Sequence, residues 1–495
     1  MNRIFHTAKV ILLGLLAAQV LSTCQVYISN IELHHTLTSI IKSGYFTVPN
    51  LYVIQQLKTF GPAFFGGLFF TLSIGIALSI FTFAVTWVWD RFFTRSKVVL
   101  IPLFPLWMGC LILLNRYGFN PLVTSYFIVI PAVVIFAFLK LMSERNIQRD
   151  WLSGTIHIIP VLLLALLWVF QISNHMFLDI RDNLLLSNRF GTKINNFYYK
   201  YTLYPAEVFR SLDQKTLKTC NLKLIKEKTI SQLLERELLN HDYLPVDENV
   251  AVDLKISKEG NILNFENNGK TILQTSLKDF SMKSGSVLRE FSLKCDRYQF
   301  FRQFTFFSIL VGFPLLLYFI IYILFYLSFN LYLDSNISSV ISSVICLIIG
   351  IALLIPIHYA KKEKIDVTNL AGTMESVRWQ ENVAALKFIR QKEIEIGNYP
   401  TYEKMLKSPH IPVRYWLARA LGVSRQYKTY KDLLSLLDDP YPNVVCQAFY
   451  ALGRRGDTKV IKKIINRIET SDHWYKQWYA YKALRTLGWK QKRSN

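Results

Sequence analysis

The chain has 495 residues, of which 52% are hydrophobic and 14% aromatic, with a mean hydropathy of +0.25 and a formal net charge of +23. This composition excludes an ordinary soluble protein of the same length and indicates a membrane protein. The positive charge favours partners that carry negative charge.

Seven apolar segments dominate the sequence. A helix of about 20 mostly apolar residues crosses the hydrocarbon core of a bilayer, and we expect spans at residues 10–28, 62–89, 98–114, 121–142, 152–173, 303–331 and 337–359. The sequence therefore predicts a mainly α-helical, polytopic membrane protein with about seven spans, five in residues 1–174 and two in residues 303–359. The first segment also resembles a secretory signal, since Arg3 and Lys9 precede it, but we expect an uncleaved anchor.

Basic residues in short loops tend to stay in the cytoplasm. They follow the second and fourth predicted spans, as Arg91, Arg95 and Lys97, and as Lys140, Arg145 and Arg149. We therefore expect a multi-pass protein of the cytoplasmic (inner) membrane of a bacterium, with a cytoplasmic N-terminus and with residues 175–302 in the periplasm. For residues 360–495 the number of crossings favours the external side, whereas Lys361, Lys362 and Lys364 favour the cytoplasm, so both sides stay open.

Residues 175–302 are predicted to form a soluble insertion domain of α+β type. Helical spacing covers residues 177–186 and 193–209, with Pro205 ending or interrupting the second helix. Short strands are expected at residues 251–256, 262–265 and 271–274, separated by good turn sequences. The aromatic residues between positions 197 and 204 are expected to pack this domain onto the membrane surface or the neighbouring spans.

Two of the six cysteines, Cys220 and Cys295, share the predicted external segment. In an oxidising compartment a disulfide between them would contribute about 2 to 4 kcal/mol. We predict this disulfide, with two separate buried thiols as the alternative.

A repeat occurs in residues 360–495. The sequence SPHIPVR at residues 408–414 leads to Ala-Leu-Gly at 420–422, and DPYPNVV at 439–445 leads to Ala-Leu-Gly at 451–453. A third copy runs from residue 471 to Gly488, so the glycines are 31 and 35 residues apart. This period is typical of solenoids built from pairs of helices.

These motifs resemble HEAT repeats of the short, phycobilisome-lyase-like kind, whose units open with an Asp-Pro-x-x-x-Val-Arg turn and end their first helix in Ala-Leu-Gly. We expect Pro to begin the helices, Ala to let paired helices approach and Gly to end them in left-handed caps. The resemblance implies a HEAT-like α-solenoid that binds a partner and has no catalytic role.

Residues 359–495 contain 26 Lys and Arg against 13 Asp and Glu, a net charge of +13. An acidic protein and membrane lipids with anionic head groups are the expected partners, and nucleic acid is the weakest candidate. We predict a partner-binding cluster made of Arg454, Arg455, Lys459, Lys462 and Lys463. Its alternative is an ordinary solvated helix face.

No catalytic, metal-binding or phosphate-binding motif was recognised, so neither a cofactor nor an enzymatic activity is predicted. The favoured function is a non-enzymatic docking or assembly protein of the membrane. A transporter or channel subunit is the first alternative, although only His157 is an ionisable residue well within a predicted span. A membrane enzyme that acts on lipid or glycan is the second.

Overall fold

The computed structural model describes residues 2–116, 118–142, 151–173, 175–246, 251–362 and 369–493. Its first part is helical throughout. The helices are α1 (Asn2–Lys42), α2 (Leu51–Gln56), α3 (Phe60–Phe70), α4 (Ile76–Phe92), α5 (Leu100–Leu114), α6 (Pro121–Leu141) and α7 (Trp151–Val169). A π-helical turn, Thr71–Gly75, joins α3 to α4, and two further long helices, α13 (Gln299–Phe329) and α14 (Ser335–Lys362), complete the apolar bundle.

Five helical segments are long and apolar enough to cross a membrane: Ile4–Lys42, Phe60–Phe92, Pro121–Leu141, Gln299–Phe329 and Ser335–Tyr359. The predicted count of about seven is not supported. Among the described residues the apolar segments Ile101–Leu114 and Ile159–Val169 are shorter, and the 15 residues of α5 extend about 22 Å, less than a hydrocarbon core of about 30 Å. The side chain of His157 lies outside the described part of α7.

Polar residues hold α1 against α3 inside the bundle. Thr71 donates a hydrogen bond to Gln19 Oε1 at 2.7 Å, and the hydroxyls of Ser22 and Thr71 are 3.1 Å apart. Gln19 also donates to the Phe64 carbonyl at 2.9 Å. Such bonds between neighbouring helices contribute to packing where lipid supplies no hydrophobic force between them.

Residues 175–302, for which we keep the name insertion domain, contain α8 (Met176–Ile180), α9 (Arg189–Tyr201), α10 (Leu203–Phe209), β1 (Lys218–Asn221), α11 (Lys228–Asn240), β2 (Tyr243–Pro245), β3 (Leu254–Glu259), β4 (Ile262–Asn267), β5 (Lys270–Ser276) and α12 (Leu277–Lys294). Its sheet has the order β2-β1-β3-β4-β5, with β1 parallel to both neighbours and antiparallel pairing from β3 to β5. Asn268 and Gly269, at φ 50° and 74°, form the last hairpin turn, as the turn chemistry predicts.

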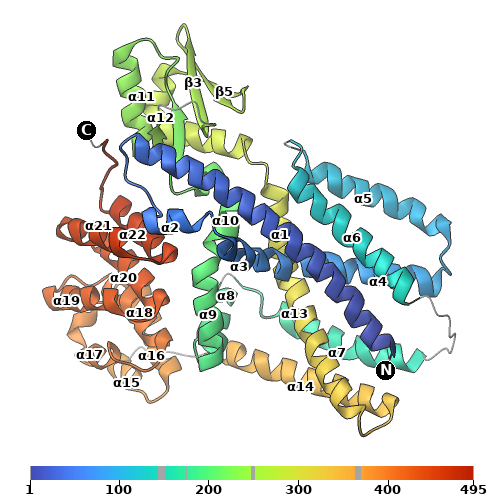
Figure 1. The fold of residues 1–495 in the computed structure, drawn as a ribbon. Coiled ribbons are helices and arrows are strands. Elements are labelled where there is room, and N and C mark those ends of the chain that lie inside the picture. Colours follow the sequence, from blue (N-terminus) through green and yellow to red (C-terminus); the bar gives the residue numbers. More distant parts are fainter. Residues whose placement is uncertain are drawn as a thin grey trace.

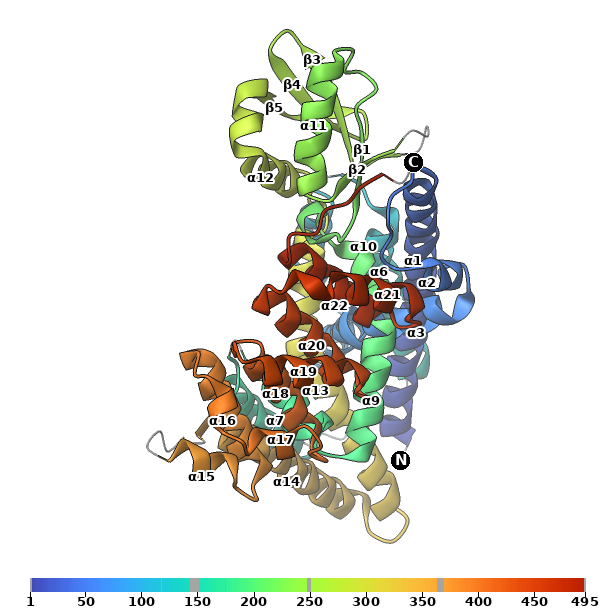
Figure 2. The ribbon, with the colours of Figure 1, turned by 90° about the vertical axis from the view of Figure 1, so that its left-hand side faces the viewer.

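The C-terminal part is an array of short helices: α15 (Leu370–Met374), α16 (Trp379–Lys392), α17 (Tyr402–Met405), α18 (Ile411–Leu421), α19 (Tyr427–Ser435), α20 (Pro442–Arg455), α21 (Ile461–Thr470) and α22 (Trp474–Thr486). We call these elements the C-terminal array. Figure 1 shows it to one side of the apolar bundle, with α9 standing between the two. Seen from the side of the array, the insertion domain and the array lie one above the other on the same side of the molecule (Figure 2).

Gly488, at φ 81° directly after α22, has the predicted left-handed conformation, but Gly422 and Gly453 have a different role from the predicted one. Gly422 has a right-handed φ of −68°, and Gly453 lies inside α20, whose left-handed cap is Gly456 at φ 76°. A Cβ atom at Gly422 would lie 2.8 Å from the Ala451 Cβ, and one at Gly453 would lie 3.1 Å from the Ala483 Cα. The Ala-Leu-Gly motif therefore lets α18, α20 and α22 approach each other closely.

Candidate functional site: the two faces of the C-terminal array

The inner face of the C-terminal array is formed by α18, α20 and α22, and it packs on the chain's own insertion domain. Asn195 of α9 and Asn443 of α20 are buried and exchange amide hydrogen bonds of 2.7 and 3.3 Å. The ring centroids of Tyr199 and Tyr475 are 4.7 Å apart, and those of Tyr204 and Trp474 are 5.0 Å apart. The predicted aromatic cluster therefore contacts both the array, through Tyr199 and Tyr204, and the candidate span that begins at Phe60, through Phe197 and Tyr201.

An ion pair is buried where α18 meets the π-helical turn that follows α8. Asp182, only 2% exposed, accepts hydrogen bonds from Arg181 at 2.6 and 2.8 Å and from Trp416 Nε1 at 2.9 Å. Arg181 also stacks on Tyr415, with 3.8 Å between its guanidinium carbon and the ring centroid. Burial alone would lower the pKa of Arg181, but the Asp182 carboxylate outweighs it and raises this pKa. The Arg181 guanidinium therefore stays charged within the interface.

The loop after α1 closes the other end of the inner face. The Asn50 side-chain amide lies 2.9 Å from each of three carbonyl oxygens, those of Ile468, Glu469 and Ser471, and its backbone N–H donates to Gln477 at 2.8 Å. Its side-chain oxygen accepts from the N–H of Val53 at 3.2 Å and so caps α2. The buried Asn50 side chain therefore supplies hydrogen bonds to backbone groups at both the start of α2 and the end of α21.

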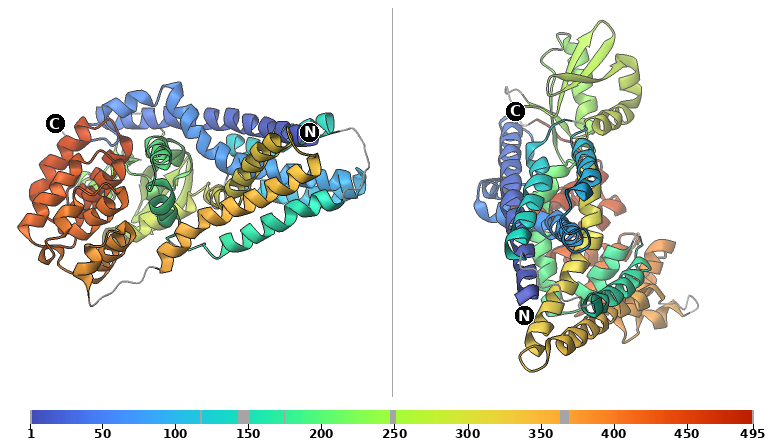
Figure 3. Two further views of the ribbon diagram at one scale, coloured as in Figure 1. Left: turned by 90° about the horizontal axis from the view of Figure 1, so that it is seen from below. Right: turned by 90° about the vertical axis from the view of Figure 1, so that its right-hand side faces the viewer.

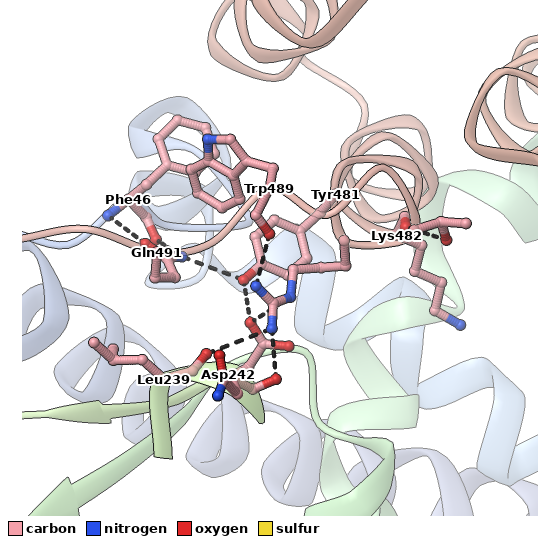
Figure 4. Close-up of polar contacts among 10 residues, drawn as sticks. Phe46, Leu239, Asp242, Tyr481, Lys482, Trp489 and Gln491 are labelled. Carbon is pink, nitrogen blue, oxygen red and sulfur yellow. Dashed lines mark hydrogen bonds and ion pairs between the residues drawn. The ribbon is translucent and has the colours of Figure 1, made fainter. Parts of the chain in front are cut away.

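A third junction joins α22 and the residues after it to the insertion domain (Figure 4). Tyr481 donates to Asp242 at 2.5 Å, and Arg485 pairs with the same carboxylate at 3.1 Å. Burial raises the pKa of Asp242, and the Tyr481 hydroxyl and Arg485 partly oppose this shift. Gln491 accepts from the Phe46 N–H and donates to the Phe46 carbonyl, at 3.2 and 2.8 Å. An open groove of about 790 Å³ lies beside this junction, with Tyr45, Trp489 and Lys492 in its lining.

The outer face of the array, formed by α19 and α21, lies on the side away from the apolar bundle (Figure 1). Lys459, Lys462 and Lys463 are exposed there and form no ion pair with a described residue. Tyr427 of α19 is 71% exposed on the same face. Apart from the end of α21, where Asn50 contacts the carbonyls of Ile468 and Glu469, the outer face is therefore cationic and exposed.

Two members of the predicted cluster already have partners within the chain. Arg454 pairs with Glu393. Arg455 donates to Thr429 Oγ1 at 3.0 Å and to the Gln426 carbonyl at 2.8 Å, and burial lowers its pKa. Arg455 therefore fixes the turn between α18 and α19. The three lysines are the members of the predicted cluster that form no ion pair with a described residue.

Cys220 and Cys295 are free thiols in the structure, and both belong to the core of the insertion domain. Burial raises the pKa of both thiols, that of Cys295 to about 11. The disulfide predicted from their shared segment stays a prediction, which peptide mass spectrometry without reduction can test. Among the described residues no group of three or more His, Cys, Asp or Glu side chains could hold a metal ion.

Most of the C-terminal array matches a family model. Residues 400–485 match the family model described as HEAT repeats, which confirms the predicted HEAT-repeat tail. HEAT repeats are typical of non-catalytic modules for protein interaction. No curated protein and no solved structure matches the chain.

The inner-face contacts could not be predicted from the sequence. Asn50 and Gln477 are separated by 427 residues, and Asp182 and Trp416 by 234. Neither residue type nor local spacing indicates such partners. The signal in the sequence was the aromatic character of positions 474–478 in the third repeat, where the first two repeats have IPVRY and PNVVC.

Proposed function

We propose that this chain is a membrane-embedded docking protein whose C-terminal HEAT array binds an acidic protein partner through its outer face. The observation that carries this proposal is the contrast between the two faces. The inner face is already occupied by Asp182, Asn195 and the backbone N–H of Asn50 from the same chain, whereas Lys459, Lys462 and Lys463 on the outer face are exposed. Charge complementarity at such a surface supports recognition and the association rate.

We further infer that the array and the insertion domain share the external side of the membrane. Direct hydrogen bonds join residues 182, 195 and 242 to the array, so an unbroken bilayer cannot separate the two parts. The N-terminus and the loop after α4 lie at the opposite end of the bundle (Figure 1). Arg91 in the last turn of α4 and Arg95 and Lys97 after it lie at that end. The positive-inside rule assigns that end to the cytoplasm, and it applies weakly to large translocated domains such as the array.

Cysteine accessibility tests this topology. In intact cells, a membrane-impermeant maleimide should label Thr458→Cys in the array and Ser187→Cys in the insertion domain, and it should leave Ser96→Cys unlabelled until the membrane is opened. All three positions are exposed, and the chain with only its native cysteines sets the background. Labelling of Ser96→Cys together with protection of the other two would reverse the orientation. Labelling of only one of Thr458→Cys and Ser187→Cys would contradict the shared side.

Replacing Lys459, Lys462 and Lys463 together with Gln should weaken partner binding by about tenfold, since each exposed charge pair contributes a fraction of 1 kcal/mol. The measurement is the amount of stoichiometric partner that co-purifies with the full-length protein across a salt series. The folded array should be retained, because surface substitutions usually change stability by no more than about 0.5 kcal/mol. Binding equal to that of the parent protein at every salt concentration would exclude the outer face as the docking site.

The alternative functions have no comparable support. Gln19 and Ser22 of α1 bond to Thr71 of the π-helical turn after α3, so these three polar residues serve helix packing. We therefore retain docking as the proposed function.

A further inference from the structure

One side of α9 packs against the C-terminal array, and another side is exposed. Its buried side carries Gly191, Asn195 and Tyr199, which face α20 and α22 or the preceding turn. Its other side leaves three large apolar side chains exposed: Phe190, 74% exposed, with Ile194 and Phe197. Tyr198 lies at the border, where its ring is exposed and its hydroxyl shares a hydrogen bond with Tyr475 of the array. With 3.6 residues per turn, Phe190, Ile194 and Phe197 form one continuous apolar stripe along the helix.

A cationic edge runs beside this stripe. Arg189, Lys193 and Lys200 are exposed, and a rotation of 100° per residue places all three within an arc of roughly 40°. None of the three forms an ion pair with a described residue. The helix therefore has three distinct sides: one packed on the array, one apolar and one cationic.

The apolar stripe is continuous with a candidate span. Phe65 of α3 lies within the segment Phe60–Phe92, and its ring centroid is 5.7 Å from that of Phe197 and 4.9 Å from that of Tyr201. Phe60 and Phe65 are themselves exposed on α3. Seen from below, α9 stands where the array meets the apolar bundle (Figure 3). The exposed aromatic surface thus passes from the end of a span directly onto α9.

We propose that α9 is an interfacial helix whose apolar stripe enters the head-group region of the bilayer, and whose Arg189, Lys193 and Lys200 bind anionic phospholipid. This inference rests on the proposed membrane insertion of the spans but not on the docking partner. An apolar side bordered by cations is the pattern of helices that lie in the plane of a membrane surface. Lys459, Lys462 and Lys463 lie on the outer face of the array. We therefore assign the contact with anionic lipid, which the sequence suggested for residues 360–495, to α9.

Photocrosslinking of the full-length protein tests the position of the stripe. The protein is placed in nanodiscs of phosphatidylcholine and phosphatidylglycerol, with p-benzoylphenylalanine replacing Phe190 or, as the matched control, Tyr427. Both positions are aromatic and more than two-thirds exposed. Irradiation should attach phospholipid to position 190 and not to position 427. Equal lipid attachment at the two positions, or attachment of protein alone at position 190, would overturn the proposal.

Native mass spectrometry of retained lipid tests the cationic edge. Replacing Arg189, Lys193 and Lys200 with Gln should lower the preference for phosphatidylglycerol over phosphatidylcholine by about fivefold for each charge removed. The same triple change at Lys459, Lys462 and Lys463 should leave that preference unaltered while it weakens partner binding, so the two proposals fail independently. An unchanged preference in the α9 variant, or an equal loss in both variants, would contradict a lipid site on α9.

Discussion

Replacing Asp182 with Ala should loosen the C-terminal array from the rest of the chain by about 3 to 5 kcal/mol, because breaking a buried ion pair leaves its partner charge uncompensated. Arg181 would lose bonds of 2.6 and 2.8 Å, and the indole N–H of Trp416 would lose its acceptor. Hydrogen exchange of residues 411–421, followed by mass spectrometry, should accelerate by a factor of about 100 or more.

A double replacement separates the loss of the pair from the exposure of one charge. Arg181→Met combined with Asp182→Leu removes both charges and keeps apolar volume, and such exchanges often cost little stability. Its exchange rate should therefore fall between those of the parent protein and of Asp182→Ala. If Asp182→Ala leaves exchange in residues 411–421 unchanged, this cluster does not hold the array in place.

Replacing Asn50 with Ala should destabilise the last repeat by about 3 kcal/mol, because it removes a helix cap and leaves buried carbonyl groups without donors. The affected groups are the carbonyls of Ile468 and Glu469 and the N–H of Val53, whereas the Ser471 carbonyl keeps a hydrogen bond from Gln477 at 2.7 Å. Limited proteolysis should produce new cleavage between residues 461 and 486, and exchange in the same segment should accelerate.

Asn50→Asp distinguishes the two roles of this side chain. Aspartate is as good as asparagine at capping the start of α2, but it has no N–H groups to donate and places a negative charge at the carbonyl end of α21. Asn50→Asp should therefore protect α2 while it destabilises α21 at least as much as Asn50→Ala. Normal protection of α21 in Asn50→Asp would show that the three carbonyl contacts contribute little.

Local patterns predicted the repeats and much of the insertion domain. The turns around Gly260 and Gly269 predicted the antiparallel strands, which the structure has as β3, β4 and β5. β1 and β2 were missed because they have only four and three residues and pair in parallel, so neither alternation nor a tight turn marks them. The break before Pro205 was predicted, since α9 ends at Tyr201 and α10 begins at Leu203.

Long-range contacts account for what local pattern could not predict in the candidate site. Arg455 and Lys462 look alike in sequence, yet Arg455 reaches back to Gln426 and Thr429 while Lys462 is exposed. Gly422 was expected to end its own helix in a left-handed cap. It must be small because Ala451 of the next repeat lies against it. In both cases the deciding neighbour is about 30 residues away, beyond the reach of helix periodicity.

The bonds between Phe46 and Gln491 join residues 445 positions apart, which has a consequence for how the protein is made. The loop after α1 is among the first segments to leave the ribosome, and its partners are among the last, so this contact forms only after synthesis is complete. Removing the last repeats would therefore expose residues 43–50 to solvent as well as deleting a docking surface. A truncated chain would present quality-control proteases with an uncovered loop, and single substitutions are the cleaner way to assign a function to the array.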